Sequence, residues 1–211
     1  MVIENIFEKY DFGDIVAYSG KDITDAMIDE CFAIDRNFYD DEYSWENSEI
    51  RQIVKEFGQM CFVFFDKNDK KVMGYSFWLP VKTTVFNAFI KEKVMLLNIK
   101  KNYCEDYKNT SSVNLFLGGE AFVVGYDLKL FHKAIEDLFQ KRVLDMAKAG
   151  IKIKYIAVEA CCDYDEQFLV PKLKLEKKVK KDKSNFYYDE YSPKKVYSES
   201  KYAKELYEFY K

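Results

Sequence analysis

Residues 122–139 read FVVGYDLKLFHKAIEDLF and predict a strand that leads directly into a helix. The first residues are aromatic and β-branched, which is typical of a strand, and apolar residues then recur at helical spacing, as at Ile135 and Leu138. In many enzymes such a junction is rich in glycine and binds phosphate, because the start of a helix leaves backbone N–H groups free. Here the junction has Gly125, and the next glycine is Gly150. The pattern indicates the element but leaves open whether it holds a ligand.

The residues around this junction predict a crossover unit. Val113–Val124, VNLFLGGEAFVV, and residues 151–158, IKIKYIAV, are both β-rich, and the helix between them ends at Gly150. A strand, a helix and a second strand over this length place the two strands parallel or nearly so.

Hairpins are predicted on both sides of the crossover unit. Residues 60–80 form two β-rich runs around the polar turn DKNDKK, and residues 172–180 pair with residues 185–191 in a second hairpin. The other elements expected are a strand at residues 15–18, a helix capped by Asp22, a helix over residues 48–57 and a short helix near residues 166–170.

Composition predicts one packed domain without a strong electrostatic field. The chain has 211 residues, of which 48% are hydrophobic, and this is enough for a sizeable core. Its 33 basic and 36 acidic side chains leave a net charge of −3, which argues against nucleic acid or an anionic membrane as a partner. The basic run at residues 172–183, KLKLEKKVKKDK, fits a solvated strand pair, with nucleic-acid binding as the alternative.

The numbers and spacing of cysteine and histidine argue against disulfide bonds and a bound zinc ion. Five cysteines without regular spacing do not form a disulfide framework, and the single histidine, His132, cannot build a zinc site alone, so no metal is expected. The first residues show no signal peptide, and no window approaches the apolar length of a membrane span. We therefore expect a cytoplasmic protein that does not bind a membrane.

The order of these elements resembles the GCN5-related N-acetyltransferase (GNAT) family over roughly residues 13–191. Residues 70–80, KKVMGYSFWLP, look like the family's third strand, in which a glycine follows two apolar residues. Residues 118–124, GGEAFVV, look like its fourth strand. Residues 142–160, RVLDMAKAGIKIKYIAVEA, resemble the end of the cofactor helix and the strand that follows it.

The resemblance implies an α/β (α+β) fold with a mixed, mostly antiparallel sheet of about seven strands and about four flanking helices. A single GNAT-like domain would span residues 1–192, with residues 81–112 as an insertion between the third and fourth strands. Residues 193–211 would form a C-terminal helical extension.

The family's chemistry implies a donor and an acceptor. The donor, acetyl-CoA or another acyl-CoA, would lie where the fourth and fifth strands splay apart, with its pyrophosphate on backbone amides at a helix N-terminus. A primary amine of a small molecule or peptide would attack the thioester directly while a base removes its proton.

The donor-binding turn departs from the family's pattern of an Arg or Gln followed by small residues. A frame that ends at Ala134 puts Lys129 near the Arg position and His132 at a glycine position. In the absence of glycines that let a phosphate approach the backbone amides closely, positive charge could come from Lys129, His132 and Lys133. Alternatively, these residues form only the polar first turn of a packed helix. The donor-binding residues predicted in this way are Phe122, Val123, Val124, Lys129, His132, Lys133 and Ala134.

Glu120 is the candidate general base, because an acidic residue in an apolar strand is costly unless it is exposed or useful. The alternative is that it faces solvent, and Glu159 is the second candidate. The tyrosine that commonly protonates the leaving thiolate in the family falls on Leu169. Tyr164 and Cys162 are therefore the candidates for this acid, each with simple packing as the alternative.

Three functions stay open on this basis. We expect an acyl-CoA-dependent N-acyltransferase, and the alternatives are a GNAT-fold binding or regulatory protein that no longer transfers acetyl groups and a transferase that uses aminoacyl-tRNA. The acidic residues within 40–46 could attract an amine or form a solvated loop. A homodimer stays an alternative to a monomer.

Overall fold

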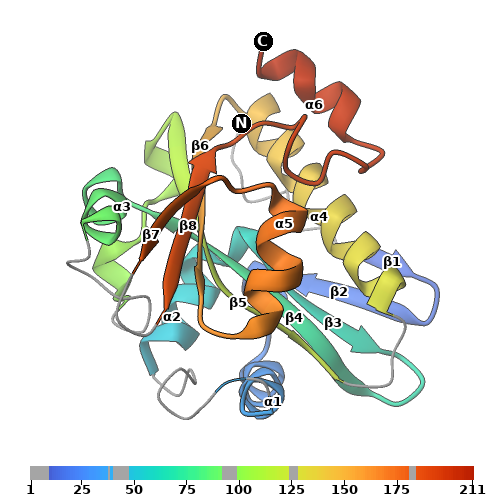
Figure 1. Ribbon diagram of the computed structural model, residues 1–211. Coiled ribbons are helices and arrows are strands. Elements are labelled where there is room, and N and C mark those ends of the chain that lie inside the picture. Colours follow the sequence, from blue (N-terminus) through green and yellow to red (C-terminus); the bar gives the residue numbers. More distant parts are fainter. Residues whose placement is uncertain (1–9, 38, 40–47, 92–98, 124–127, 181–183) are drawn as a thin grey trace.

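One mixed sheet forms the centre of the molecule (Figure 1). The described residues form eight strands in the order β1-β2-β3-β4-β5-β6-β8-β7, and every neighbouring pair is antiparallel except β5 and β6. The strands are β1 (Tyr10–Phe12), β2 (Ile15–Ser19), β3 (Cys61–Asp66), β4 (Lys71–Val81), β5 (Ser112–Phe122), β6 (Lys152–Ala160), β7 (Lys177–Lys180) and β8 (Asn185–Glu190). The computed structural model describes residues 10–37, 39, 48–91, 99–123, 128–180 and 184–211.

Helices cover both faces of this sheet (Figure 1). Leu115 and Leu117 of β5 belong to the apolar cluster under α4, whereas Phe116 between them belongs to the cluster under α1, α2 and α3, as the alternation of side chains along a strand requires. The helices are α1 (Asp25–Asp35), α2 (Ser48–Phe57), α3 (Thr83–Ile90), α4 (Leu128–Lys148), α5 (Val170–Leu173) and α6 (Ala203–Phe209). The shorter turns are η2 (Gly20–Asp22), η4 (Gly58–Met60), η6 (Lys101–Tyr103), η7 (Tyr107–Asn109) and the π-helical turn η8 (Asp165–Leu169).

The predicted crossover unit is confirmed. Strands β5 and β6 are parallel and are joined by α4, whose apolar stripe packs on the sheet through residues such as Ile135 and Phe139. Gly150 follows the helix with φ +85°, a left-handed conformation that glycine adopts without a Cβ penalty. The predicted hairpin at residues 60–80 is β3 with β4, and the mixed, mostly antiparallel sheet is as expected.

Strands β5 and β6 diverge before they end. Their pairing stops at Leu117 opposite Val158, although β5 goes on pairing with β4 as far as Phe122. On the other side, β6 goes on pairing with β8 as far as Ala160. The sheet therefore splays open beside residues 118–122, as the resemblance implied.

Two predicted boundaries are wrong. Asp22 does not cap α1, because it lies in η2, and Thr24 accepts the hydrogen bond from Met27 N instead. The strand expected from Lys172 begins only at Lys177, because the buried Leu173 belongs to α5. Lys174 then ends this helix with φ 54°.

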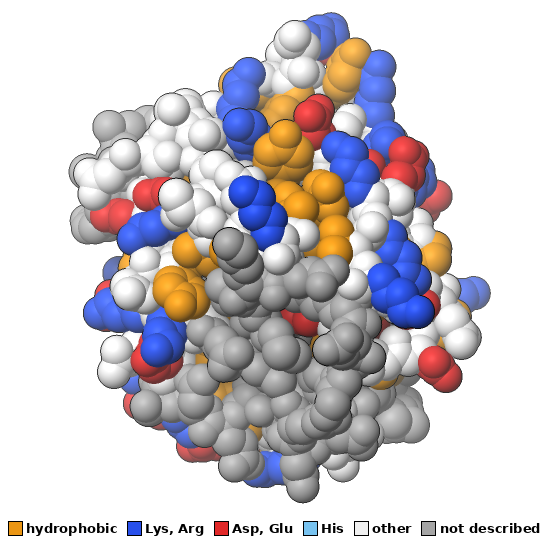
Figure 2. Space-filling model, turned by 60° about the vertical axis from the view of Figure 1, so that its left-hand side comes forward, with side chains coloured by type: hydrophobic (Ala, Val, Ile, Leu, Met, Phe, Trp, Pro, Cys, Tyr) orange, Lys and Arg blue, Asp and Glu red, His pale blue; other side chains and the backbone are white. Residues whose placement is uncertain are grey.

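The described part of the basic run includes the edge strand β7 of the sheet. The ammonium groups of Lys177 and Lys178 lie 5.7 and 5.0 Å from the ring centroids of Tyr188 and Tyr187. Figure 2 turns the side of the molecule with β7 and β8 forward and shows Lys and Arg side chains next to hydrophobic ones on this face. Lysines on an edge strand oppose pairing with another chain, which is one structural role for this run.

The insertion at residues 81–112 lies at the far end of β5 from the splay. Its turns η6 and η7 directly precede Ser112, and Val81 bridges to Cys104. Glu120 is eight residues farther along the strand, which corresponds to about 26 Å at the rise of a β-strand. The turns η6 and η7 therefore do not reach Glu120, and helix α3 of the insertion packs on the face of the sheet opposite α4.

Gly74 of β4 allows α4 to approach the sheet. A Cβ at this position would lie 2.7 Å from the Ala121 carbonyl oxygen and 2.8 Å from the Phe131 ring. We expect Gly74→Ala to destabilise the protein by about 1–3 kcal/mol, measured by urea unfolding. Gly58→Ala is the matched control, because the nearest atom to its Cβ would be 3.4 Å away. Equal losses in the two variants would contradict the close approach.

Candidate functional site

Glu120 lies in β5 at the splay, opposite Ser76 of β4. Its side chain is 1% exposed, so the alternative of a solvent-facing carboxylate is wrong. Ser76 Oγ donates to Glu120 Oε2 at 3.0 Å, and the Tyr164 hydroxyl donates to Oε1 at 3.5 Å. Burial raises the pKa of this carboxyl to about 7, because few groups replace the water that an ionised carboxylate would bind. Glu120 can therefore exchange a proton at neutral pH.

His132 of α4 faces the same carboxylate. Its Nδ1 lies 3.8 Å from Glu120 Oε1, and its Nε2 lies 3.4 Å from the Tyr164 hydroxyl. The imidazole stacks on the Tyr164 ring, with 6.3 Å between centroids and 11° between planes. Burial, helped by the nearby charge of Lys172, lowers the pKa of His132 to about 4, so the ring is neutral at pH 7.

The hydroxyl of Tyr164 connects Glu120 and His132. It lies just before η8, and its O–H is positioned between Glu120 and His132. Burial and the neighbouring Glu120 carboxylate raise the pKa of this phenol, so it stays protonated. The three side chains form a path from the buried carboxylate to His132, which is 24% exposed.

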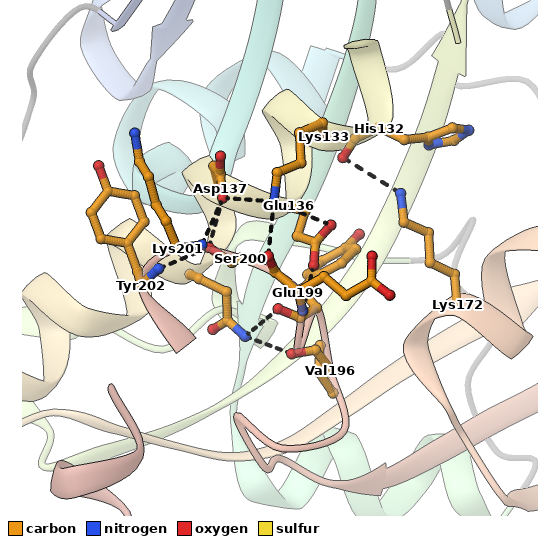
Figure 3. A network of polar contacts seen from close by, with 12 residues as sticks. His132, Lys133, Glu136, Asp137, Lys172, Val196, Glu199, Ser200, Lys201 and Tyr202 are labelled. Atoms are coloured by element: carbon orange, nitrogen blue, oxygen red, sulfur yellow. Dashed lines mark hydrogen bonds and ion pairs between the residues drawn. The ribbon is translucent and has the colours of Figure 1, made fainter. Parts of the chain in front are cut away.

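A cavity of about 340 Å³ lies on the α4 side of this path. It is bounded by the first turns of α4, by η8 and α5, and by one residue of the C-terminal region. Figure 3 shows Lys172 pointing at the backbone of His132, where its Nζ donates to the carbonyl oxygen at 3.4 Å. The lining includes Lys129, His132, Lys133, Tyr164, Lys172 and Glu199.

A C-terminal segment, residues 196–202, packs along α4 (Figure 3), and its Glu199 lines the cavity. Lys133 Nζ donates to the Glu199 carbonyl oxygen at 2.9 Å, and Glu199 N donates to Glu136 Oε1 at 2.9 Å. Asp137 Oδ1 accepts from Ser200 Oγ at 2.8 Å. The expected C-terminal extension therefore supplies a wall of the cavity in addition to the helix α6.

Only some of the predicted donor-binding residues line the cavity. Lys129, His132 and Lys133 line the cavity together. Phe122 and Ala134 are buried in the core beside it, where the Phe122 ring lies 5.7 Å from the ring of Tyr164. Val123 N donates to the Met73 carbonyl oxygen at 2.7 Å, which is a strand contact. Val124 and the acidic residues within 40–46 lie outside the described residues.

Cys162 and Glu159 are not part of the path. Burial and the neighbouring Asp165 raise the pKa of Cys162 to about 11, so its thiol is protonated at neutral pH and is a weak nucleophile. Its backbone N–H donates to Asp165 Oδ2 at 3.3 Å. Glu159 is buried on the neighbouring strand and accepts from Ser184 Oγ at 2.7 Å.

Two residues that the sequence analysis did not single out lie beside Glu120 where the sheet splays open. Asp165 is buried and accepts hydrogen bonds from Cys161 N and Cys162 N, and burial raises its pKa. The Tyr39 hydroxyl lies 3.3 Å from the Glu120 carbonyl oxygen and 3.4 Å from Asp165 Oδ1. These contacts join segments 81 and 126 residues apart, and no local pattern predicts such a contact.

Among the described residues, no group of three or more His, Cys, Asp or Glu side chains could hold a metal ion. None of the described helices has both the length and the apolar character needed to cross a membrane.

Comparison with known proteins finds likeness in structure only. No protein-family model and no curated protein matches the chain. Naa50 of Arabidopsis thaliana, solved with a bisubstrate analogue, has a TM-score of 0.52 at 7% identity, over 85% of this chain and 99% of the other. A GNAT-family acetyltransferase from Listeria monocytogenes has a TM-score of 0.50 at 12% identity, over 87% and 100%.

A third similar structure is the loading GNATL domain of CurA from Lyngbya majuscula. Its TM-score is 0.52 at 10% identity, over 84% of this chain and 98% of that domain. In all three comparisons nearly the whole of the other chain is matched, so the likeness covers the complete fold and not one motif. The chain therefore has the fold of the GNAT acetyltransferases.

Proposed function

We propose that the protein is an N-acyltransferase that moves an acetyl or another acyl group from acyl-CoA to a primary amine of a small molecule or peptide. The observation that carries this proposal is Glu120, a buried carboxyl with a pKa near 7 at the point where β5 and β6 separate. A carboxylate with this pKa is well matched to remove a proton from an amine at neutral pH.

The path from Glu120 to His132 supports direct attack on the thioester. As the amine nitrogen bonds to the acyl carbon, its N–H proton passes to Glu120, and the C–S bond breaks to leave a thiolate. Tyr164 gives its phenolic proton to the sulfur and regains one from Glu120, so the products are an amide and a thiol. His132 is neutral and orients the Tyr164 hydroxyl. Cys162 is a second candidate for the proton donor, because its thiol is protonated.

The lysines of the cavity support binding of the donor phosphates. Lys129 and Lys133 extend from the first turns of α4, and Lys172 faces them from α5. Ammonium groups bind phosphate as point charges, without the close backbone approach that a glycine loop permits. In the proposal they replace the missing glycine pattern, while Phe122, Val123 and Ala134 shape the apolar floor beside the acyl chain.

The acceptor class follows from the same site. The Naa50 structure contains a bisubstrate analogue that joins CoA to a peptide, so peptide N-terminal amines are one class to test, together with small primary amines. Tyr39 and Asp165 lie next to Glu120 and outside the cavity that the lysines line, and we propose that the amine binds beside them.

Thermal unfolding with acetyl-CoA tests the proposal. A ligand that binds only the folded state should stabilise it by about 2.7 kcal/mol at a hundredfold excess over its Kd. We expect this shift for the natural chain and its loss in the double variant Lys129→Glu, Lys133→Glu.

The control is the double variant Lys21→Glu, Lys204→Glu, which makes the same charge change at exposed residues of η2 and α6 outside the cavity lining. This variant is expected to keep the full shift. If millimolar acetyl-CoA does not shift the natural chain, the proposed donor is wrong and a binding or regulatory protein with this fold becomes the better description.

A further inference from the structure

Ser76 is a fully buried serine in the apolar strand β4. Its Cα partner across the antiparallel ladder is Glu120, and its Oγ donates to Glu120 Oε2 at 3.0 Å. Buried hydroxyls are normally hydrogen-bonded, so one explanation is that the carboxylate only satisfies the serine. The arrangement around the pair favours a second explanation, in which Ser76 acts on Glu120.

A β-bulge turns Glu120 toward the face of the sheet that α4 covers. The register between β4 and β5 shifts between Phe77 and Trp78 of β4. Leu117 and Phe122 of β5 both belong to the apolar cluster under α4, although they are an odd number of residues apart and regular alternation would place them on opposite faces. Glu120 shares the face of Phe122, so its carboxylate points to the side on which the cavity lies.

The two oxygens of the Glu120 carboxylate have different surroundings. Oε2 accepts from Ser76 Oγ within the sheet. Oε1 lies 3.5 Å from the Tyr164 hydroxyl and 3.8 Å from His132 Nδ1, and both of these residues line the cavity. The bond from Ser76 therefore fixes one oxygen and leaves the other beside the residues that reach the cavity.

Ser76 also opposes the effect of burial on this carboxyl. Burial is the main cause that raises the pKa of Glu120, and the charge of Asp165 acts in the same direction. The charge of Lys172 and the hydrogen bonds from Ser76 and Tyr164 lower the pKa. A hydrogen bond to the ionised form favours that form, so Ser76 helps to keep part of Glu120 ionised at neutral pH.

We propose that Ser76 is a positioning residue for the reaction, which holds one oxygen of Glu120 so that the other takes the amine proton and returns it to Tyr164. The inference rests on the proposed acyltransferase function and adds to it a residue that acts through Glu120 and needs no contact with a substrate. It also explains why a polar side chain is kept at this place in an apolar strand.

The test is Ser76→Ala, assayed by release of the CoA thiol from acetyl-CoA over a range of pH. Loss of the hydrogen bond raises the pKa of Glu120, so the midpoint of the rise in rate should move up by about one pH unit. At pH 7 this shift corresponds to a rate lower by about fivefold, because less of the carboxyl is ionised. Ser76→Cys keeps a weak donor and should give an intermediate midpoint.

Urea unfolding of the same variants gives a second readout that needs no substrate. In Ser76→Ala the pH range over which Glu120 lowers the stability should extend upward by the same shift. A serine that only fills space would change the free energy of unfolding equally at every pH and leave the midpoint of the rate unchanged.

Ser184→Ala is the matched control, because Ser184 is also buried and donates to a buried glutamate of the central sheet, Glu159, at 2.7 Å. It should keep the natural midpoint in both measurements. A natural midpoint in Ser76→Ala, or equal shifts in the two serine variants, overturns the inference and leaves the acyltransferase in place if Glu120→Gln is slow. If Glu120→Gln keeps the natural rate, the proposed base and the role of Ser76 are both wrong.

Discussion

Replacing Glu120 with glutamine is expected to slow acyl transfer by about 10²- to 10⁴-fold, the usual contribution of a general base. The amide can still accept from Ser76 Oγ, so the fold around it is kept, but it cannot take a proton from the amine. The measurement is release of the CoA thiol from acetyl-CoA in the presence of an accepted amine. In the natural chain the rate should rise with pH up to about 7, the pKa of Glu120, because only the ionised form is a base.

Glu159→Gln is the matched control for this variant. Glu159 is also a buried glutamate of the central sheet, on the strand next to β5, and it accepts from Ser184 Oγ. We expect it to keep the rate of the natural chain to within a few-fold. A loss in Glu159→Gln with no loss in Glu120→Gln would reverse the two assignments and make Glu159 the base.

The free energy of unfolding should depend on pH through the same carboxyl. Its pKa is about 7 in the folded protein against an ordinary value of 4.5, so between these two values the folded state binds more protons than the unfolded state. Stability therefore falls as pH rises from 4.5 to 7, by about 3 kcal/mol for this group alone. Glu120→Gln removes this dependence, so its unfolding free energy relative to the natural chain should increase by that amount between pH 4.5 and 8.

The difference between the two proteins is the quantity to measure, because His132 acts in the opposite direction. Its pKa falls from 6.5 to about 4 on folding, so the unfolded state binds more protons between these values and stability rises with pH there. This contribution is present in both proteins and cancels in the difference. Parallel curves from urea unfolding at each pH would show that Glu120 has an ordinary pKa and is accessible to water.

The fold was predictable from the sequence because its signals are local. The spacing of Ile135 and Leu138 and the glycine at Gly150 define α4 and its end, and the β-rich runs on each side define a crossover with one allowed hand. The error at Lys172 has a local cause as well. Leucines that alternate with lysines fit a strand, but Leu173 is buried as the last residue of a helical turn.

The site was predictable only in part. Glu120 and the basic turn at Lys129 and Lys133 could be found, because a charge in an apolar strand and a polar helix start are visible in one segment. Asp165 and Tyr39 could not. Their roles depend on contacts between distant segments and on burial, and a tyrosine that packs has the same local pattern as a tyrosine that faces a ligand.

The sheet can assemble mainly between neighbours along the chain, because its strand order follows the chain order except for the exchange of β7 and β8. The site cannot, since Tyr39 meets Asp165 across 126 residues and Glu136 meets Glu199 across 63. Closing such loops costs entropy that local pairing does not, so the site should form after the sheet. It is then also the region most easily opened, and a bound ligand would protect this late-forming region while leaving the early-forming sheet unchanged.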